Sequence, residues 1–177
     1  MSEITTYTRR LFDPLAPKPS AISEVDIAHA LSLLSRAGGH FAHFYSVAQH
    51  CLNCAKEAKA RACSRRVVLA CLLHDASEAY LSDITRPVKA HLARYLEIEA
   101  VLQTAIYQKW ISPDLTEHEL ALVKEIDDTL LHHEFFNIMG EAVFSPAPPL
   151  FAELTFDFEP FDKIEAEYLA MLSALTA

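Results

Sequence analysis

The chain has 177 residues, a length that suits one domain with a sizeable hydrophobic core. Hydrophobic residues make up 51% of it and only three residues are glycine, which favours a helical protein. The formal net charge is −9, and the basic residues are scattered. This argues against a polymeric nucleic acid as the partner, whereas a single nucleotide needs only a local basic pocket.

The first ten residues are polar and lack the apolar stretch of a signal peptide. The longest strongly apolar run, Val67–Leu73, is far too short to span a membrane. We therefore expect a cytoplasmic protein with no membrane partner. Cys51-x-x-Cys54 lacks a second cysteine pair or a spaced histidine pair, so both cysteines are expected to be small buried residues and not zinc ligands.

Residues 1–22 predict an extended arm, because prolines at 14, 17 and 19 interrupt a regular helix. Residues 23–177 predict a single all-α domain. Its helices are expected at about 23–36, 46–59, 64–81, 88–110, 117–139 and 162–175. Ser23-x-x-Asp26 and Ser46-x-x-Gln49 resemble capping boxes at two of the helix starts. Residues 150–161 are expected to form a cover segment, either a strand or an irregular stretch.

The stretch 71–83 organises the chain, because it adds one imidazole and three carboxylates to the end of an apolar run. Burying ionisable groups without partners is costly, so such groups are normally paired or bound to a metal. Glu78 follows His74 by four residues and Asp75 by three, which on a helix brings all three side chains to one side. The stretch therefore predicts a metal site with a carboxylate beside it.

Two other helices offer further ligands. His50 borders the buried stripe of its helix, and Asp127 falls inside the apolar stripe of the helix 117–139. Asp128 falls on a more solvated side, so Asp127 is the expected fourth ligand. The neighbouring His132 and His133 diverge by about 100° on a helix and are expected at the surface or at a helix end.

Two imidazoles and two carboxylates suit one divalent ion such as Mn, Fe, Co, Ni or Zn. Glu78 is expected to orient or deprotonate the attacking water. Asp83 is expected to protonate the leaving group or to bind a substrate hydroxyl. Arg36 and Lys89 are the candidates for holding a phosphate group.

The ordered set His50, His74-Asp75 and Asp127 resembles the signature of the HD-domain metal-dependent phosphohydrolase superfamily. The run from His74 to Glu78, with Asp83 and then Pro87-Val88-Lys89, is similar to the bacterial HD-domain 5′-deoxyribonucleotidases. Residues 26–31 and 45–50 resemble a phage- and prophage-associated branch. The resemblance covers residues 7–140, most of the domain.

The resemblance implies a helical bundle around one divalent metal held by His50, His74, Asp75 and Asp127. It implies release of phosphate from deoxyribonucleoside 5′-monophosphates, with release of triphosphate from dNTPs as the alternative. Glu78 would stand beside the nucleophilic water, and Asp83 would face the substrate. The nucleotidases carry a tryptophan after the phosphate-binding arginine, where this chain has Ala37. The candidate replacements in the sugar pocket are His40, Phe41 and Phe44.

Two readings from other classes stay open at this point. One is a catalytically silent HD-fold module that binds a nucleotide. The other is an ordinary helical bundle in which each buried polar residue is satisfied locally. The apolar stripes of the helix 88–110 could serve a homo-oligomer or the core, so the sequence leaves the oligomeric state open.

Overall fold

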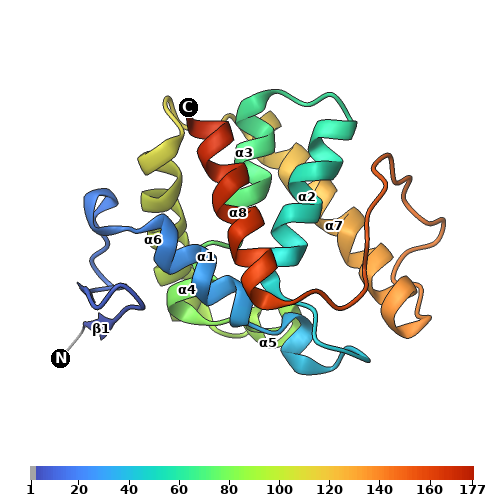
Figure 1. Cartoon of the computed structure of the whole chain (residues 1–177), viewed down its shortest axis with the longest axis horizontal. Helices are drawn as coiled ribbons and strands as arrows, with labels where there is room; N and C mark the ends of the chain where they lie inside the picture. Colours follow the sequence, from blue (N-terminus) through green and yellow to red (C-terminus); the bar gives the residue numbers. More distant parts are fainter. Residues whose placement is uncertain (1–2) are drawn as a thin grey trace.

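The computed structural model describes residues 3–177, and nearly all of its regular secondary structure is helical, which confirms the all-α prediction (Figure 1). Strands β1 and β2 form a short antiparallel pair in the N-terminal arm. Residues 1–2, the start of the predicted arm, lie outside the described residues. In chain order the elements are β1 (Ile4–Thr5), β2 (Leu11–Phe12), η1 (Pro19–Ala21), α1 (Glu24–Leu33), η2 (Arg36–Gly39), α2 (Val47–Ala60), α3 (Arg65–Leu73), α4 (Glu78–Leu81), α5 (Arg86–Lys89), α6 (Ala93–Trp110), α7 (Glu117–Met139) and α8 (Phe161–Thr176).

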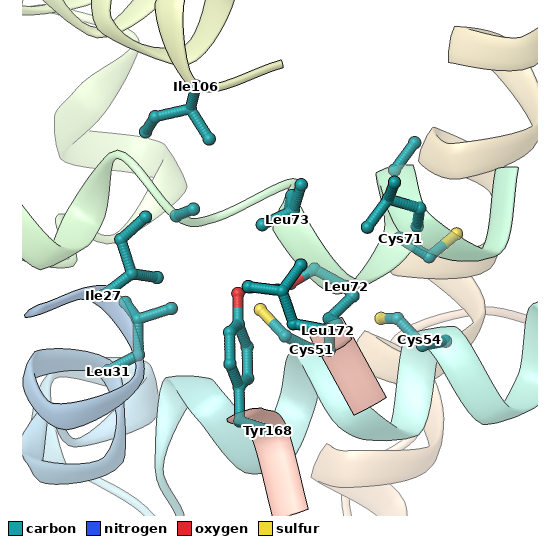
Figure 2. Packing of buried hydrophobic residues seen from close by; sticks show 14 of the residues in the cluster. Ile27, Leu31, Cys51, Cys54, Cys71, Leu72, Leu73, Ile106, Tyr168 and Leu172 are labelled. Carbon is teal, nitrogen blue, oxygen red and sulfur yellow. The ribbon is translucent and has the colours of Figure 1, made fainter. Parts of the chain in front are cut away.

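The helices α2 and α3 form a hairpin at the centre of the molecule. Figure 1 shows α8 in front of this hairpin and α7 behind it, and both helices contact α2 and α3. Figure 2 shows Tyr168 and Leu172 of α8 beside Cys51 of α2 and Leu72 of α3. All four side chains are buried, and burying a large apolar side chain contributes about 1.5–3 kcal/mol. Polar groups on these helices are therefore held by a close-packed core.

Serine caps start three helices, including the two predicted from the capping-box pattern. In each, the serine hydroxyl accepts a hydrogen bond from the backbone N–H three residues later; the caps are Ser23, Ser46 and Ser64. Asp26, three residues after Ser23, also makes contacts outside the cap, which the capping-box prediction did not include. Its carboxylate accepts hydrogen bonds from the backbone N–H and the hydroxyl of Thr8, at 2.7 and 3.0 Å. Asp26 therefore ties the N-terminal arm to α1.

The prediction of one helix over residues 64–81 is wrong, because α3 ends at Leu73 and α4 begins at Glu78. Side chains bind the last carbonyls of α3, and the carbonyl of Leu73 also accepts a hydrogen bond from the backbone N–H of Ala76 at 3.0 Å. Three such donors are Tyr168 Oη to Leu72 at 2.8 Å, Gln103 Nε2 to Leu73 at 2.8 Å, and His74 Nδ1 to Cys71 at 2.7 Å. The backbone turns between the two helices, and this turn carries His74 and Asp75.

The predicted helix 88–110 is also two elements, since α5 ends at Lys89 and α6 begins at Ala93. None of the residues of α5 is buried, whereas Leu102, Ala105 and Ile106 of α6 reach the core. Over residues 3–177, no helix combines the length and the apolar character that a membrane crossing requires.

The predicted cover segment is irregular and runs along α2. Side chains at four-residue intervals on α2 bind its backbone: Gln49 Nε2 donates to the carbonyl of Asp157 at 3.0 Å, and Asn53 Nδ2 to that of Thr155 at 3.0 Å. One turn later, the buried carboxylate of Glu57 accepts from the backbone N–H groups of Phe151 and Ala152, at 3.1 and 2.9 Å. We call these three side chains, Gln49, Asn53 and Glu57, the α2 ladder.

Candidate metal centre

Four side chains from three parts of the fold bring one atom each to a common point. His50 Nε2, on α2, lies 3.1 Å from His74 Nε2 and 3.3 Å from Asp127 Oδ1. His74 Nε2 lies 3.3 Å from Asp75 Oδ2. Ligand atoms at right angles around one ion, with bonds of about 2.1 Å, are about 3.0 Å apart. Two nitrogens and two carboxylate oxygens at these separations fit a single divalent ion.

The other ring nitrogen of each histidine is already bound, which sets the direction of Nε2. His74 Nδ1 donates to the carbonyl of Cys71, and His50 Nδ1 lies 2.5 Å from Glu134 Oε1. Burial raises the pKa of Glu134, but the charges of His50 and Arg36 outweigh it and hold this pKa below its usual value. Glu134 is therefore an ionised acceptor, and both histidines can offer the Nε2 lone pair to an ion.

Asp127 and Asp128 face different surroundings, as their positions on α7 predict. Asp127 Oδ1 points to the two histidines, and the hydrogen bonds and charges of His50 and His74 overcome burial to hold its pKa well below the usual range. Asp128 instead pairs with Lys124 at 2.6 Å, at the surface. The structure thus brings Asp127, and not Asp128, to the cluster.

The buried thiols of Cys51 and Cys54 lie close enough to form alternative three-residue groups, one with His50 and His74 and one with His74 and Asp75. Figure 2 shows both sulfurs beside apolar side chains of the core, and Cys54 Sγ also lies 3.6 Å from His50 Nε2. Burial raises the pKa of each thiol, which keeps it protonated, and metals bind the thiolate. Cys51 Sγ also lies 4.0 Å from His74 Nδ1, the nitrogen that is turned away from the cluster. The nitrogen and oxygen set is the better ligand group.

Arg36 stands against the carboxylates of the cluster. Its guanidinium lies 3.2 Å from Asp75 Oδ2, 3.5 Å from Asp127 Oδ1 and 3.4 Å from Glu134 Oε2. Burial lowers the pKa of Arg36, but these acidic neighbours raise it further than burial lowers it. The next residue, Ala37, has a φ of 56°, a left-handed conformation that costs energy for a residue other than glycine. The turn that follows α1 thus places this cation beside the predicted ligands.

Glu78 is nearly fully buried at the start of α4. Burial, and then the charges of Asp75 and Asp83, raise its pKa to about 9. Its Oε1 lies 3.4 Å from Lys89 Nζ, while its buried Oε2 has no hydrogen-bond partner among the described residues. Lys89 is held more closely by Glu99, at 2.7 Å. An unpartnered buried carboxyl oxygen of this kind is suited to bind a molecule that enters from outside.

A cavity of about 600 Å³ opens beside the cluster. One side carries charged residues, namely Arg36, Asp75, Glu78, Asp83, Arg86, Lys89 and Asp127. Another part of the lining is apolar and includes Leu131, Phe135, Met139 and Val143. His40 also lines the cavity, beside Ala37. The cavity is therefore lined by two of the predicted ligands, Asp75 and Asp127, by the predicted acid–base and phosphate-binding residues, and by apolar side chains.

Three residues that the sequence analysis considered lie at positions other than those expected. Phe41 is buried against Tyr45 and Phe135, and Phe44 lies at a separate surface hollow, so neither lines the cavity. His132 is buried, in contrast to the surface position expected for it, and accepts a hydrogen bond from the backbone N–H of Phe144 at 3.1 Å.

Sequence reasoning missed Glu134, Glu99 and the pairing of Arg86 with Asp127. A signal for Glu134 was available, because it follows Asp127 by two helical turns and Leu130 by one, on the apolar stripe of α7. An ionisable residue on such a stripe needs a partner, which is the argument that singled out Asp127. Glu99 and Arg86 carry no comparable signal, because they lie at partly exposed positions whose neighbours come from other helices.

Comparison with known proteins adds a family match and two relatives. The profile of the HD domain matches residues 35–173. The uncharacterized protein YfdR of Escherichia coli (strain K12) is 39% identical over 115 residues, which are 64% of this chain and 61% of that protein. The uncharacterized protein RCAP_rcc00048 of Rhodobacter capsulatus is 32% identical over 175 residues, 91% of this chain and 89% of that protein. Neither relative carries a functional name.

Proposed function

The chain belongs to the HD domain family, and from this premise we propose that it is a metal-dependent nucleotide phosphohydrolase. The favoured substrates are deoxyribonucleoside 5′-monophosphates, from which it would release phosphate. The observation that carries the proposal is the approach of four ligand atoms to one point beside a charged cavity; these are His50 Nε2, His74 Nε2, Asp75 Oδ2 and Asp127 Oδ1.

These four side chains would hold one divalent ion. The mixture of imidazole and carboxylate suits Mn, Fe, Co, Ni or Zn. An ion bound there supplies a Lewis acid for the phosphoryl group and lowers the pKa of coordinated water. Four protein ligands would leave positions for water and substrate on a six-coordinate ion, and two of the four, Asp75 and Asp127, line the cavity.

Glu78 is the residue that we assign to the attacking water. Its free Oε2 can accept a hydrogen bond from a water in the cavity, while Lys89 contacts Oε1. Its pKa of about 9 is the value for Glu78 without an ion in the site. Positive charge held next to a carboxyl favours its ionised form, so Glu78 would be available as a base near neutral pH.

Asp83, Arg36 and Lys89 complete the phosphate end of the cavity. Burial and the charge of Asp75 raise the pKa of Asp83 by more than the charge of Arg36 lowers it. A raised pKa suits a group that donates a proton to the departing 5′ oxygen. Arg36 and Lys89 would hold the phosphate by charge-assisted hydrogen bonds.

The apolar side of the cavity would receive the nucleoside. Leu131, Phe135 and Met139 lie on successive turns of α7 and present a continuous apolar surface. A base has two apolar faces, so van der Waals contact with this surface is its natural mode of binding. His40, on the same cavity, is the proposed contact of the sugar.

The charges of the cavity favour a monophosphate over a triphosphate. Each of the three cations is already paired with carboxylates: Arg36 with three, and Arg86 and Lys89 with two each. A triphosphate carries more negative charge than a monophosphate and would need more unpaired positive charge along its length.

The test is a product assay on metal-stripped protein, with Mn²⁺, Co²⁺, Ni²⁺, Zn²⁺ or Mg²⁺ added back singly. The substrates are deoxy- and ribonucleoside mono- and triphosphates. We expect phosphate release from deoxyribonucleoside monophosphates that depends on the metal. Release of triphosphate would favour the dNTP triphosphohydrolase. Tight nucleotide binding without turnover would favour the silent binding module.

A matched pair of variants sharpens the assay. His74→Gln removes one nitrogen of the cluster and is expected to abolish both metal binding and turnover. His118→Gln changes an exposed histidine of α7 and is expected to keep both. Wild-type turnover by metal-stripped His74→Gln protein would contradict the proposal.

A further inference from the structure

Arg86 divides its guanidinium between two neighbouring carboxylates of α7. One nitrogen donates to Asp127 Oδ2 and the other donates to Asp128 Oδ1 at 2.7 Å. Lys124 binds the second oxygen of Asp128 at 2.6 Å. Asp128 is therefore held between two cations, and it keeps the guanidinium of Arg86 directed at Asp127.

This contact distinguishes the two oxygens of Asp127. Oδ1 lies 3.3 Å from His50 Nε2 and 3.8 Å from His74 Nε2, on the side of the proposed ion. Oδ2 is occupied by the close hydrogen bond from Arg86, whereas Oδ1 has a longer contact with a guanidinium, that of Arg36, whose Nη2 lies 3.5 Å away. A carboxylate can bind an ion through one oxygen or through both, and a guanidinium on the second oxygen leaves only the first.

We infer that Arg86 is a positioning residue that keeps Asp127 a single-oxygen ligand, so that a coordination position stays free for water or substrate. The inference rests on the proposed metal-dependent function. It extends a pattern seen at both histidines, where Glu134 and the carbonyl of Cys71 bind the nitrogens that face away from the ion. Partners of this kind orient metal ligands and tune the bound ion.

The alternative explanation, that the contact of Arg86 with Asp127 serves only to stabilise the fold, is less well supported. Arg86 lies on α5, which has four residues and none buried. Half of its side chain is exposed, and exposed ion pairs contribute little to stability. Loss of Arg86 should therefore change the metal site more than it changes the fold.

The test uses the full chain loaded with Co²⁺, whose visible absorption weakens as its coordination number rises. Three variants are compared with the wild type: Arg86→Met, which removes both donors; Arg86→Lys, which keeps the charge and one donor; and Arg94→Met as control. Arg94 is 80% exposed and pairs with Glu97 at 2.6 Å, on its own helix. The thermal midpoint of each metal-free protein reports the fold.

Arg86→Met is expected to show weaker visible absorption per bound Co²⁺, because Asp127 can then bind through both oxygens. Its kcat should fall about tenfold or more. Arg86→Lys should recover part of both losses, and Arg94→Met should match the wild type. If Arg86→Met does not fold, Arg86→Lys decides the question by the same spectrum.

One result would overturn the inference alone, namely a wild-type Co²⁺ spectrum in Arg86→Met, whatever its turnover. A tighter dissociation constant beside that unchanged spectrum would show that Arg86 acts only through its positive charge. A wild-type protein that binds no divalent ion would instead overturn the proposed function, and the inference with it. The wild-type titration separates these failures.

Discussion

Glu134 Oε1 lies 2.5 Å from His50 Nδ1, and both side chains are fully buried. The contact joins α7 to α2 behind the candidate metal centre. A buried carboxylate needs compensating charge, and Arg36 supplies part of it with Nε at 3.4 Å from Glu134 Oε2. Glu134 does not line the cavity, yet it sets the ring orientation of one predicted ligand.

Glu134→Gln should weaken metal binding by about 10–100-fold, because the amide can turn its NH₂ group toward His50 and no longer fixes the proton on Nδ1. Calorimetric titration of metal-free protein with Co²⁺ or Mn²⁺ measures the effect. Glu141→Gln, at an exposed position beyond α7, is the control. Equal affinity in the two variants would show that the buried carboxylate does not orient His50.

Glu78→Gln should lower kcat by about 10²–10⁴-fold, since the amide cannot take a proton from water. The four predicted ligands are unchanged, so the bound metal per chain should stay at the wild-type value. Single-turnover kinetics together with metal analysis of the same sample would establish both points. Retention of the wild-type kcat would remove Glu78 from the proposed mechanism.

The acid limb of the stability curve should depend on Glu119 at the start of α7. The hydrogen bond from Arg66, and then that from the backbone N–H of Thr116, lower the pKa of Glu119 to about 2. The unfolded value is about 4.3, so between these pH values the unfolded chain binds more protons than the folded one. The stabilising contribution is therefore complete above about pH 4.3 and is lost as the pH falls toward 2.

Glu119→Gln removes this titration. We expect it to lower the unfolding free energy at pH 7 by less than about 1 kcal/mol and to flatten its fall between pH 4.5 and 2. Urea unfolding over a pH series measures both effects. Glu117→Gln, an exposed neighbour on the same turn, serves as the comparison. Parallel acid limbs for wild type and Glu119→Gln would contradict the assignment.

Tyr168→Phe should destabilise the protein by about 1–3 kcal/mol, because the buried carbonyl of Leu72 loses its side-chain donor. Urea unfolding of metal-free protein is the appropriate measurement. Tyr95→Phe removes a hydroxyl that donates to the carbonyl of Ser82 on the exposed side of the molecule, and it should cost less. A loss no larger than that of Tyr95→Phe would mean that the end of α3 does not depend on this bond.

Much of the fold and part of the candidate site could be predicted from local pattern. The predicted helix 117–139 coincides with α7, because its apolar spacing, its start and Gly140 at its end agree with one another. The same periodicity places Asp127 on the apolar side of the helix and Asp128 on its more solvated side. Residues on one regular helix keep a fixed angular relation, so their common face can be read without knowledge of the partner helices.

The parts that were not predicted depend on groups far away in the sequence. The break after Leu73 needs Tyr168 and Gln103, which lie 96 and 30 residues from the carbonyls that they bind. Local propensity favours one continuous helix there, and tertiary hydrogen bonds override it. The pairing of Arg86 with Asp127 likewise joins two elements whose packing no local pattern specifies.

The α2 ladder has a consequence for how freely the cover segment can vary. Within residues 151–157, Gln49, Asn53 and Glu57 bind only backbone atoms. Side chains of this segment other than Leu154 and Phe156, which pack against the core, could therefore be exchanged without loss of these hydrogen bonds to α2. Proline is the exception at positions 151 and 152, because it lacks the N–H that Glu57 requires and would leave that buried carboxylate without two of its donors.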